Sequence, residues 1–147
     1  MADKASDGSQ NGAAAEQAEY APSLMVKAQY VKDFSFENPG APEILATLQS
    51  DPDVNINVNV EVGRLNNGDF EVILSIAADA KAGSKQIFLA ELSYAGVFAI
   101  DGNVPEEQHG PILLIECPRL LFPFARNIIA DATREGGFPP LMLQPID

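Results

Sequence analysis

The sequence predicts an α+β domain in which a four-stranded antiparallel sheet has helices packed on one face. Three observations lead to this prediction. Apolar and polar residues alternate with a period of two in four segments between residues 24 and 98. Short turns separate the last three segments, as in a meander. Helical spacing of apolar residues over a long segment appears only after residue 101. Strands followed by helices are typical of the α+β class.

The first predicted strand is Leu24–Glu37. Its alternation puts one apolar set on one face, with Lys32 breaking the pattern: Val26, Ala28, Tyr30, Phe34 and Phe36. The other face carries Lys27, Gln29, Val31, Asp33, Ser35 and Glu37. The prolines and glycine in residues 38–42 end the strand, and residues 43–49 have the spacing of a short helical turn. We therefore expect a crossover here, because this connection is too long for a tight hairpin.

The next three strands are predicted at Val54–Val62, Phe70–Ala80 and Lys85–Phe98. Asn66–Asp69 contains Asn-Gly, which tolerates positive φ and favours a hairpin. Residues predicted to face inward on the last two strands are Phe70, Val72, Leu74, Ile76, Phe88, Ala90, Leu92 and Tyr94. The opposite face of the last strand is expected to carry Ile87, Leu89, Glu91 and Ser93.

A helix start is predicted at Pro105, which is followed by two glutamates near the positive end of the helix dipole. A longer helix is predicted from about Pro118 to Glu135. Its expected apolar stripe is Leu121, Phe124, Ala125, Ile128 and Ala132. Pro123 is expected to kink this helix or shift its start, because proline lacks the amide hydrogen. The glycines and prolines in residues 136–140 stop it.

Length and composition indicate one globular domain with a tail. The chain has 147 residues, of which 46% are hydrophobic. Residues 1–20 contain small and polar residues almost exclusively and are predicted to be a disordered tail. Residues 21–147 form the predicted domain. No segment has the length and hydropathy of a membrane span, and the N-terminus does not read as a secretory signal, so we expect a cytoplasmic protein.

The net charge of −12 bears on possible partners. An acidic surface repels nucleic-acid phosphates and anionic lipids, so neither nucleic acid nor membrane insertion is expected. Basic or unfolded polypeptide is favoured instead, because long-range attraction steers cationic chains toward an acidic protein. Solubility alone is an alternative reason for the charge.

The residues that usually carry catalysis are sparse, so we do not expect an enzyme. His109 is the only histidine, and a surface role is favoured over a catalytic one. Cys117 is the only cysteine, and a small buried hydrophobe is favoured over a reactive thiol. Metal clusters and phosphate-binding loops lack their usual motifs, so neither metal nor cofactor is expected.

One surface feature is predicted from strand periodicity. Asp33 and Glu37 share a face of the first strand, and Glu91 and Leu89 share a face of the fourth. If these strands lie in the same sheet, the result is an acidic face with an exposed leucine. A solvated strand face without a partner is the alternative.

Several segments together resemble the bacterial export chaperone family SecB. They are Tyr30–Pro39 with the sequence YVKDFSFENP, Phe88–Leu92 followed by Gly96–Phe98, Cys117–Arg126 with the sequence CPRLLFPFAR, and the segments Gly137–Pro140 and Leu141–Pro145. The resemblance covers about Leu24 to Asp147.

The resemblance implies an export chaperone without nucleotide hydrolysis, assembled as a homotetrameric dimer of dimers. It would keep unfolded precursor proteins competent for translocation and deliver them to the SecA translocation ATPase. The matching positions for the ATPase are Asp33, Glu37, Leu89 and Glu91. Clients would bind in apolar grooves beside the crossover and the long helix, and the matching residues are Phe34, Phe36, Leu45, Leu48, Phe122 and Phe124.

The sequence departs from the family in two respects. The family's further C-terminal helix is apparently missing after Asp147, and the crossover has no tryptophan, for which Leu45 or Leu48 would substitute. Two alternative functions are weighed: a SecB-like chaperone for an antitoxin, and a carrier of a small hydrophobic ligand.

Overall fold

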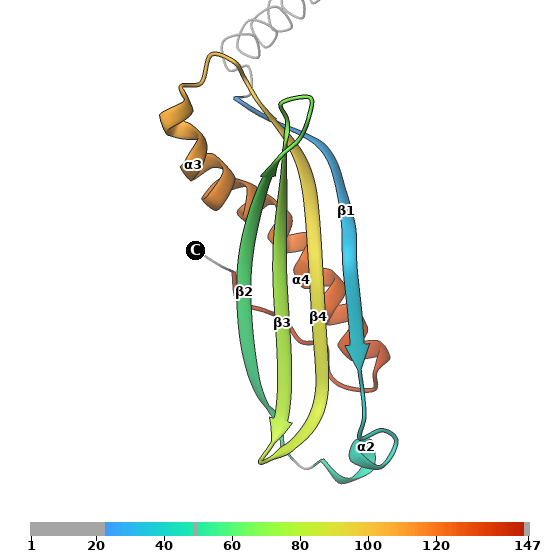
Figure 1. Ribbon diagram of the computed structural model, residues 1–147. Helices are drawn as coiled ribbons and strands as arrows, with labels where there is room; N and C mark the ends of the chain where they lie inside the picture. The colour runs from blue at the N-terminus through green and yellow to red at the C-terminus, as the bar shows by residue number, and fades with distance from the viewer. Residues whose placement is uncertain (1–22, 49, 146–147) are drawn as a thin grey trace, which may run out of the picture.

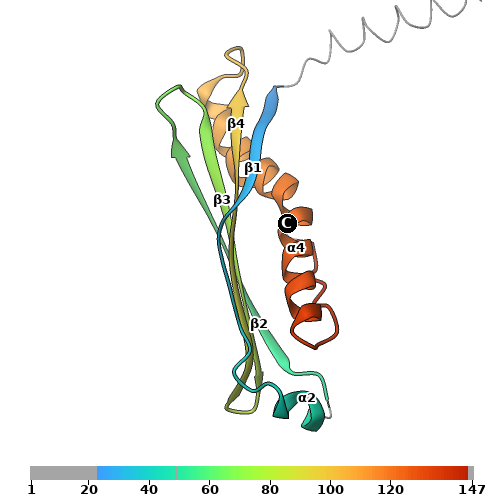
Figure 2. The same cartoon turned by 90° about the vertical axis from the view of Figure 1, so that its right-hand side faces the viewer.

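The computed structural model describes residues 23–48 and 50–145, so the predicted tail at residues 1–20 lies outside the described residues. The described chain forms one antiparallel sheet with the strand order β1-β4-β3-β2. A long helical segment crosses one face of the sheet (Figure 1). The other face, called the outer face below, has no described helix over it (Figure 2). The predicted α+β class is confirmed.

The strands are β1 (Leu24–Glu37), β2 (Asp53–Arg64), β3 (Phe70–Ala82) and β4 (Lys85–Ile100). β2, β3 and β4 form the predicted meander, and the first strand pairs with β4. The turn between β2 and β3 uses Gly68 at φ 91°, which explains the Asn-Gly sequence. The crossover from β1 to β2 contains the short helix α2 (Glu43–Thr47).

The helical segment begins with the short elements η1 (Glu106–Gln108), α3 (His109–Pro111) and η2 (Ile112–Glu116), and it continues as α4 (Cys117–Glu135). η2 is a π-helical stretch just before Pro118. π-type turns accommodate irregularities in the hydrogen-bond ladder, so this stretch is suited to a proline that has no amide to donate. α4 continues as a helix through Pro123, so this proline does not set the start of the helix.

The helix side of the sheet holds two adjoining clusters of buried apolar residues. The larger lies under η2 and the first three turns of α4, where Val72, Leu74 and Ile76 of β3 meet Leu121 and Ile129. The smaller lies near the crossover and contains Ile44, Phe88 and Phe138. A fully buried aliphatic or aromatic side chain contributes about 1.5–3 kcal/mol, so these clusters hold the helix to the sheet.

The predicted faces of β1 are partly wrong. The register with β4 shifts between Val26 and Ala28 and again between Val31 and Asp33, which indicates bulges at Lys27 and Lys32. Each extra residue reverses the alternation, and Tyr30 is therefore turned to the outer face. Its hydroxyl contacts Glu71 of β3, while Gln29 turns inward and donates to the Tyr94 hydroxyl at 3.3 Å.

A further shift corrects the prediction for the start of β4. The register between β3 and β4 changes between Ala80 and Lys81, opposite Ile87. Ile87 is fully buried in the smaller cluster and does not lie on the outer face. The neighbouring Leu89 keeps its predicted position and is partly buried.

The predicted apolar stripe of the helix is rotated. Leu121 and Ala125 are fully buried as expected, but Phe124 is 51% exposed. The buried face passes instead through Cys117, Phe122 and Ile129. Sequence spacing allows either face, because Phe122 and Phe124 both lie within one turn of Leu121.

Candidate binding surfaces

The four residues predicted to form an acidic face meet on the outer face of the sheet. β1 and β4 are neighbours, and their register places Glu37 opposite Leu89 and Asp33 opposite Ser93. Glu91 lies between these pairs, opposite Ser35. Asp33, Glu37 and Glu91 are exposed, and we call these residues with Leu89 the acidic face. Three carboxylates within two neighbouring strands favour a basic partner.

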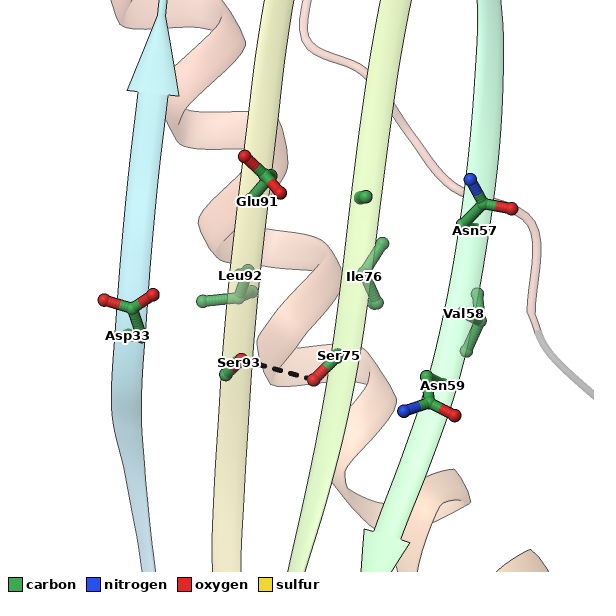
Figure 3. Close-up of a pocket in the computed structure, with 10 residues that line it drawn as sticks. Asp33, Asn57, Val58, Asn59, Ser75, Ile76, Glu91, Leu92 and Ser93 are labelled. Carbon is green, nitrogen blue, oxygen red and sulfur yellow. Dashed lines mark hydrogen bonds between the residues drawn. The ribbon is translucent and has the colours of Figure 1, made fainter.

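The acidic face borders a shallow cavity that the sequence did not predict, lined by both polar and apolar residues (Figure 3). Its volume is about 240 Å³, and Asp33 and Glu91 lie on one side of it. Ser75 and Ser93 face each other in the middle at 3.2 Å, and Asn57 and Asn59 of β2 lie on the opposite side. The alternating asparagines of β2 were the available signal, since they must share one face of that strand.

A second unpredicted cluster lies on the outer face of the same sheet. Tyr30 donates its hydroxyl hydrogen to Glu71, and the Lys32 ammonium lies 2.9 Å from the same carboxylate. The hydrogen bonds from Tyr30 and Lys32 lower the pKa of Glu71. Burial, followed by the hydrogen bond and charge of Glu71, raises the pKa of Tyr30 to about 12. The negative charge of Glu71 is therefore balanced by the Lys32 ammonium, and Glu71 does not extend the acidic face.

On the helix side, two adjoining cavities of about 230 Å³ and about 240 Å³ lie between the crossover and the segment after α4. They share Leu48, Asp51, Phe138 and Pro139, and we call them together the crossover groove. Leu45 lines the first cavity; Val54, Phe88, Leu141 and Met142 line the second. The Phe88 and Phe138 rings, with centroids 5.2 Å apart, make its aromatic part.

The predicted client residues fall in different places. Leu45 and Leu48 line the crossover groove, and Phe36 packs beside it with its ring centroid 5.8 Å from that of Phe88. Phe34 is on the surface of β1, where it pairs with Leu92. Phe124 is exposed over Tyr94, with 6.3 Å between the ring centroids.

Phe122 does not lie at a surface, and its predicted position in a groove is wrong. It is 4% exposed and belongs to the larger core cluster, and Arg126 covers the ring at 5.7 Å. The groove residues missed by the prediction come from three places: the chain from Ser50 to Val54, Phe88 of β4, and residues 137–142. The apolar run after Pro139-Pro140 was the signal for the latter.

Cys117 and His109 occupy structural positions. Cys117 is fully buried, and burial, aided by the charge of Glu116, raises the pKa of its thiol to about 12. The His109 ring packs edge-on against Phe70, with 5.9 Å between centroids. Among residues 23–48 and 50–145, no group of three or more histidine, cysteine or acidic side chains is arranged to hold a metal ion. No described helix is both long and apolar enough to cross a membrane.

Comparison with known proteins identifies the family. The family model described as preprotein translocase subunit SecB matches residues 17–147. The protein-export protein SecB of Xanthobacter autotrophicus is 59% identical over 138 residues, which cover 94% of this chain and 86% of that protein. The protein-export protein SecB of Parvibaculum lavamentivorans is 50% identical over 147 residues, covering all of this chain and 87% of that protein.

A solved structure shares the fold. The SecB-like chaperone of Mycobacterium tuberculosis, solved with a peptide from an antitoxin, matches with a TM-score of 0.71 and 16% identity. The match covers 88% of this chain and 95% of that chain. With the fold, the family model and close relatives in agreement, the chain belongs to the SecB family of protein-export chaperones.

Proposed function

We propose that this export chaperone acts in the cytoplasm without enzymatic chemistry, holds unfolded precursor proteins in the crossover groove, and delivers them to the SecA translocation ATPase through the acidic face. The observation that supports this proposal is the placement of the two surfaces. The acidic face is on the outer side of the sheet, and the crossover groove is on the helix side. A client and the ATPase would therefore bind at the same time without competing for residues.

The lining of the crossover groove suits clients of many sequences. Leucine, methionine, proline and phenylalanine dominate the larger cavity. Hydrophobic contact is non-directional, and methionine adapts its shape to what it contacts. A shallow apolar site of this kind favours exposed apolar segments of an unfolded chain over one defined ligand.

We also propose that the chain works as a homotetramer, a dimer of dimers. Single chains of soluble proteins rarely expose large apolar patches. Here Met25, Val26 and Val31 are exposed on the edge strand β1, and Leu114, Leu120 and Phe124 are exposed on the helical segment. Two sets of exposed residues on different elements suit two kinds of subunit contact. Light scattering at micromolar concentration tests this directly, and a monodisperse monomer would contradict the proposal.

The two-surface proposal is tested with two sets of variants and two partners. Asp33→Asn, Glu37→Gln and Glu91→Gln together remove three charges from the acidic face. Exposed charge pairs contribute about 0.2–1 kcal/mol each, so the triple variant should weaken SecA binding measurably and flatten its salt dependence. A control with the same change of charge is Glu106→Gln, Glu107→Gln and Glu116→Gln, all exposed and on the helical segment.

The second set changes the crossover groove. Leu45→Ser with Leu48→Ser should weaken binding of an unfolded precursor and leave SecA binding unchanged. Leu65→Ser, at an exposed leucine in the turn after β2, is the matched control. Both partners are measured by calorimetry against both sets. If the acidic triple variant lost clients and kept SecA, the assignment of the two faces would be wrong.

A further inference from the structure

Thr133 combines complete burial with an unusual set of hydrogen bonds near the end of α4. The side chain is 0% exposed. Its Oγ1 lies 3.0 Å from the carbonyl oxygens of Ile129 and Ala130, one turn earlier in the helix, and donates its hydrogen there. The same oxygen accepts a hydrogen bond from the Leu141 amide at 2.9 Å. One hydroxyl thus joins the helix to the segment that follows it.

The segment after the helix depends on this residue. The Phe138 amide donates to the Thr133 backbone carbonyl at 3.1 Å, and the Leu141 amide donates to its hydroxyl. Pro139 and Pro140 lie between them and have no amide hydrogen to donate. Within residues 138–145, these are the two hydrogen bonds by which the described backbone amides hold the segment to α4.

This segment forms one wall of the crossover groove. Residues 138–142 all line the larger cavity, opposite Leu48, Val54 and Phe88. The two prolines stiffen the segment, because their φ angles are fixed. The Phe138, Leu141 and Leu143 side chains of this segment pack against the two core clusters. The backbone of the wall is tied to α4 at two hydrogen-bonded points, and both end on Thr133.

We propose that Thr133 is a positioning residue for client binding, whose buried hydroxyl fixes the position of the 138–142 wall and so the width of the crossover groove. Thr133 does not contact the client. The inference rests on the proposed function, in that the crossover groove is taken as the client site. Without the hydroxyl, the Leu141 amide loses its acceptor, and of the two hydrogen bonds to α4 only the one from the Phe138 amide remains.

The test compares Thr133→Val with Thr133→Ser. Valine keeps the branched shape and removes the hydroxyl, while serine keeps the hydroxyl and removes a methyl group. Binding of a dye-labelled polypeptide, reduced and alkylated so that it stays unfolded, is measured by anisotropy. Thr133→Val is expected to raise Kd for this client about three- to tenfold, and Thr133→Ser to restore it to near the wild-type value. Binding to SecA should not change in either variant.

A stability control separates positioning from general weakening. Ile129→Val truncates a fully buried side chain one turn before Thr133 and lowers stability without removing the hydroxyl. It should leave client Kd unchanged. If Ile129→Val weakened client binding as much as Thr133→Val, or if serine gave no rescue, the inference would be overturned.

Amide exchange of the wild-type protein gives a readout that does not depend on a variant folding. The Leu141 amide is expected to exchange much more slowly than the exposed Gln144 amide. Equal exchange at the two positions would mean that the Thr133 bond does not hold the wall.

The two sets of variants separate this inference from the proposed function. If the Leu45 and Leu48 variants weaken client binding and Thr133→Val does not, only the inference about Thr133 is wrong. If neither set has an effect, the crossover groove is not the client site and both fall.

Discussion

Tyr30 on β1 donates its hydroxyl hydrogen to Glu71 on β3, across the strand β4 that lies between them. On β4, Tyr30 is opposite the fully buried Ala95 and Glu71 is opposite Val97, so the bond runs diagonally across this strand. Lys32 adds an ion pair at 2.9 Å. These contacts tie the bulged edge strand β1 to the central strand β3. Because Tyr30 and Glu71 both titrate, the free energy of unfolding should depend on pH in both the alkaline and the acidic range.

At alkaline pH the contribution of Tyr30 is expected to disappear. Its pKa is about 12 in the folded protein and about 10 in an unfolded chain. A raised pKa stabilises the fold fully below pH ~10, and this contribution is lost as the pH rises through ~12. Tyr30→Phe should therefore lose less stability over this range than the wild type. Urea midpoints measured along the alkaline series check this; identical slopes for both proteins would contradict it.

The contribution of Glu71 to stability should be lost at the other end of the pH scale, as the pH falls. Its pKa is lowered in the folded protein, so its stabilisation is present above the unfolded value of about 4.5 and is lost as the pH falls through the folded value. Glu71→Gln removes this part of the acid dependence. Glu61→Gln serves as the control, since Glu61 is exposed on β2 and has no ion pair in the described part of the chain. The control should keep the wild-type acid slope in urea unfolding.

The contact between α2 and the end of α4 requires a glycine. Gly137 has φ 96°, and a Cβ built there would lie 2.9 Å from the Leu45 Cδ1 atom. Gly137→Ala therefore combines backbone strain of about 1–2 kcal/mol with a close contact that the end of the Leu45 side chain must move to relieve, at a small further cost. Gly68→Ala has similar strain at φ 91° with no atom near the added Cβ, so it should cost less. Adding Leu45→Ala to Gly137→Ala should recover part of the difference in urea unfolding; an additive double variant would exclude a cost from this contact.

Two phenylalanines that are two residues apart, on opposite sides of α4, should respond very differently to truncation. Phe122 is 4% exposed and Phe124 is 51% exposed. Phe122→Ala should cost about 3–5 kcal/mol of unfolding free energy, because it leaves a cavity in the core. Phe124→Ala should cost about 1 kcal/mol, chiefly through its stacking on Tyr94. Chemical denaturation measures both values, and similar losses would show that the helix is rotated relative to the described structure.

The single thiol should be unreactive in the folded protein. Cys117 is fully buried, and its pKa is raised to about 12. Iodoacetamide near pH 8 should modify it only in denaturant, as mass spectrometry would show. Cys117→Ser should preserve client binding and cost about 1–3 kcal/mol of stability, because a buried hydroxyl without a partner is unfavourable. Loss of client binding with an intact fold would point to a thiol-dependent role.

Local patterns in the sequence were sufficient for most elements of the fold. Alternation located all four strands, and the first was predicted at its observed bounds, Leu24–Glu37. The Asn-Gly turn and the late helical spacing predicted the meander and α4. The acidic residues were placed on one face because Asp33 and Glu37, like Leu89 and Glu91, are separated by even numbers of residues along their strands.

Only the tertiary structure decided which way particular side chains point and which distant segments meet. Tyr30 was misplaced because it lies between two bulges, each of which reverses the alternation, and Ile87 because it is itself the extra residue at a register shift. A bulge depends on pairing with the neighbouring strand. Phe122 is buried in place of Phe124 because packing against the sheet fixes the rotation of α4. The crossover groove joins Leu45, Leu48, residues 50–52 and Val54 to Phe88 and residues 137–142, and its shape depends on non-local contacts such as the Thr133–Leu141 bond. Periodicity describes each segment by itself, whereas a binding site is made by the packing of segments that are far apart in the chain.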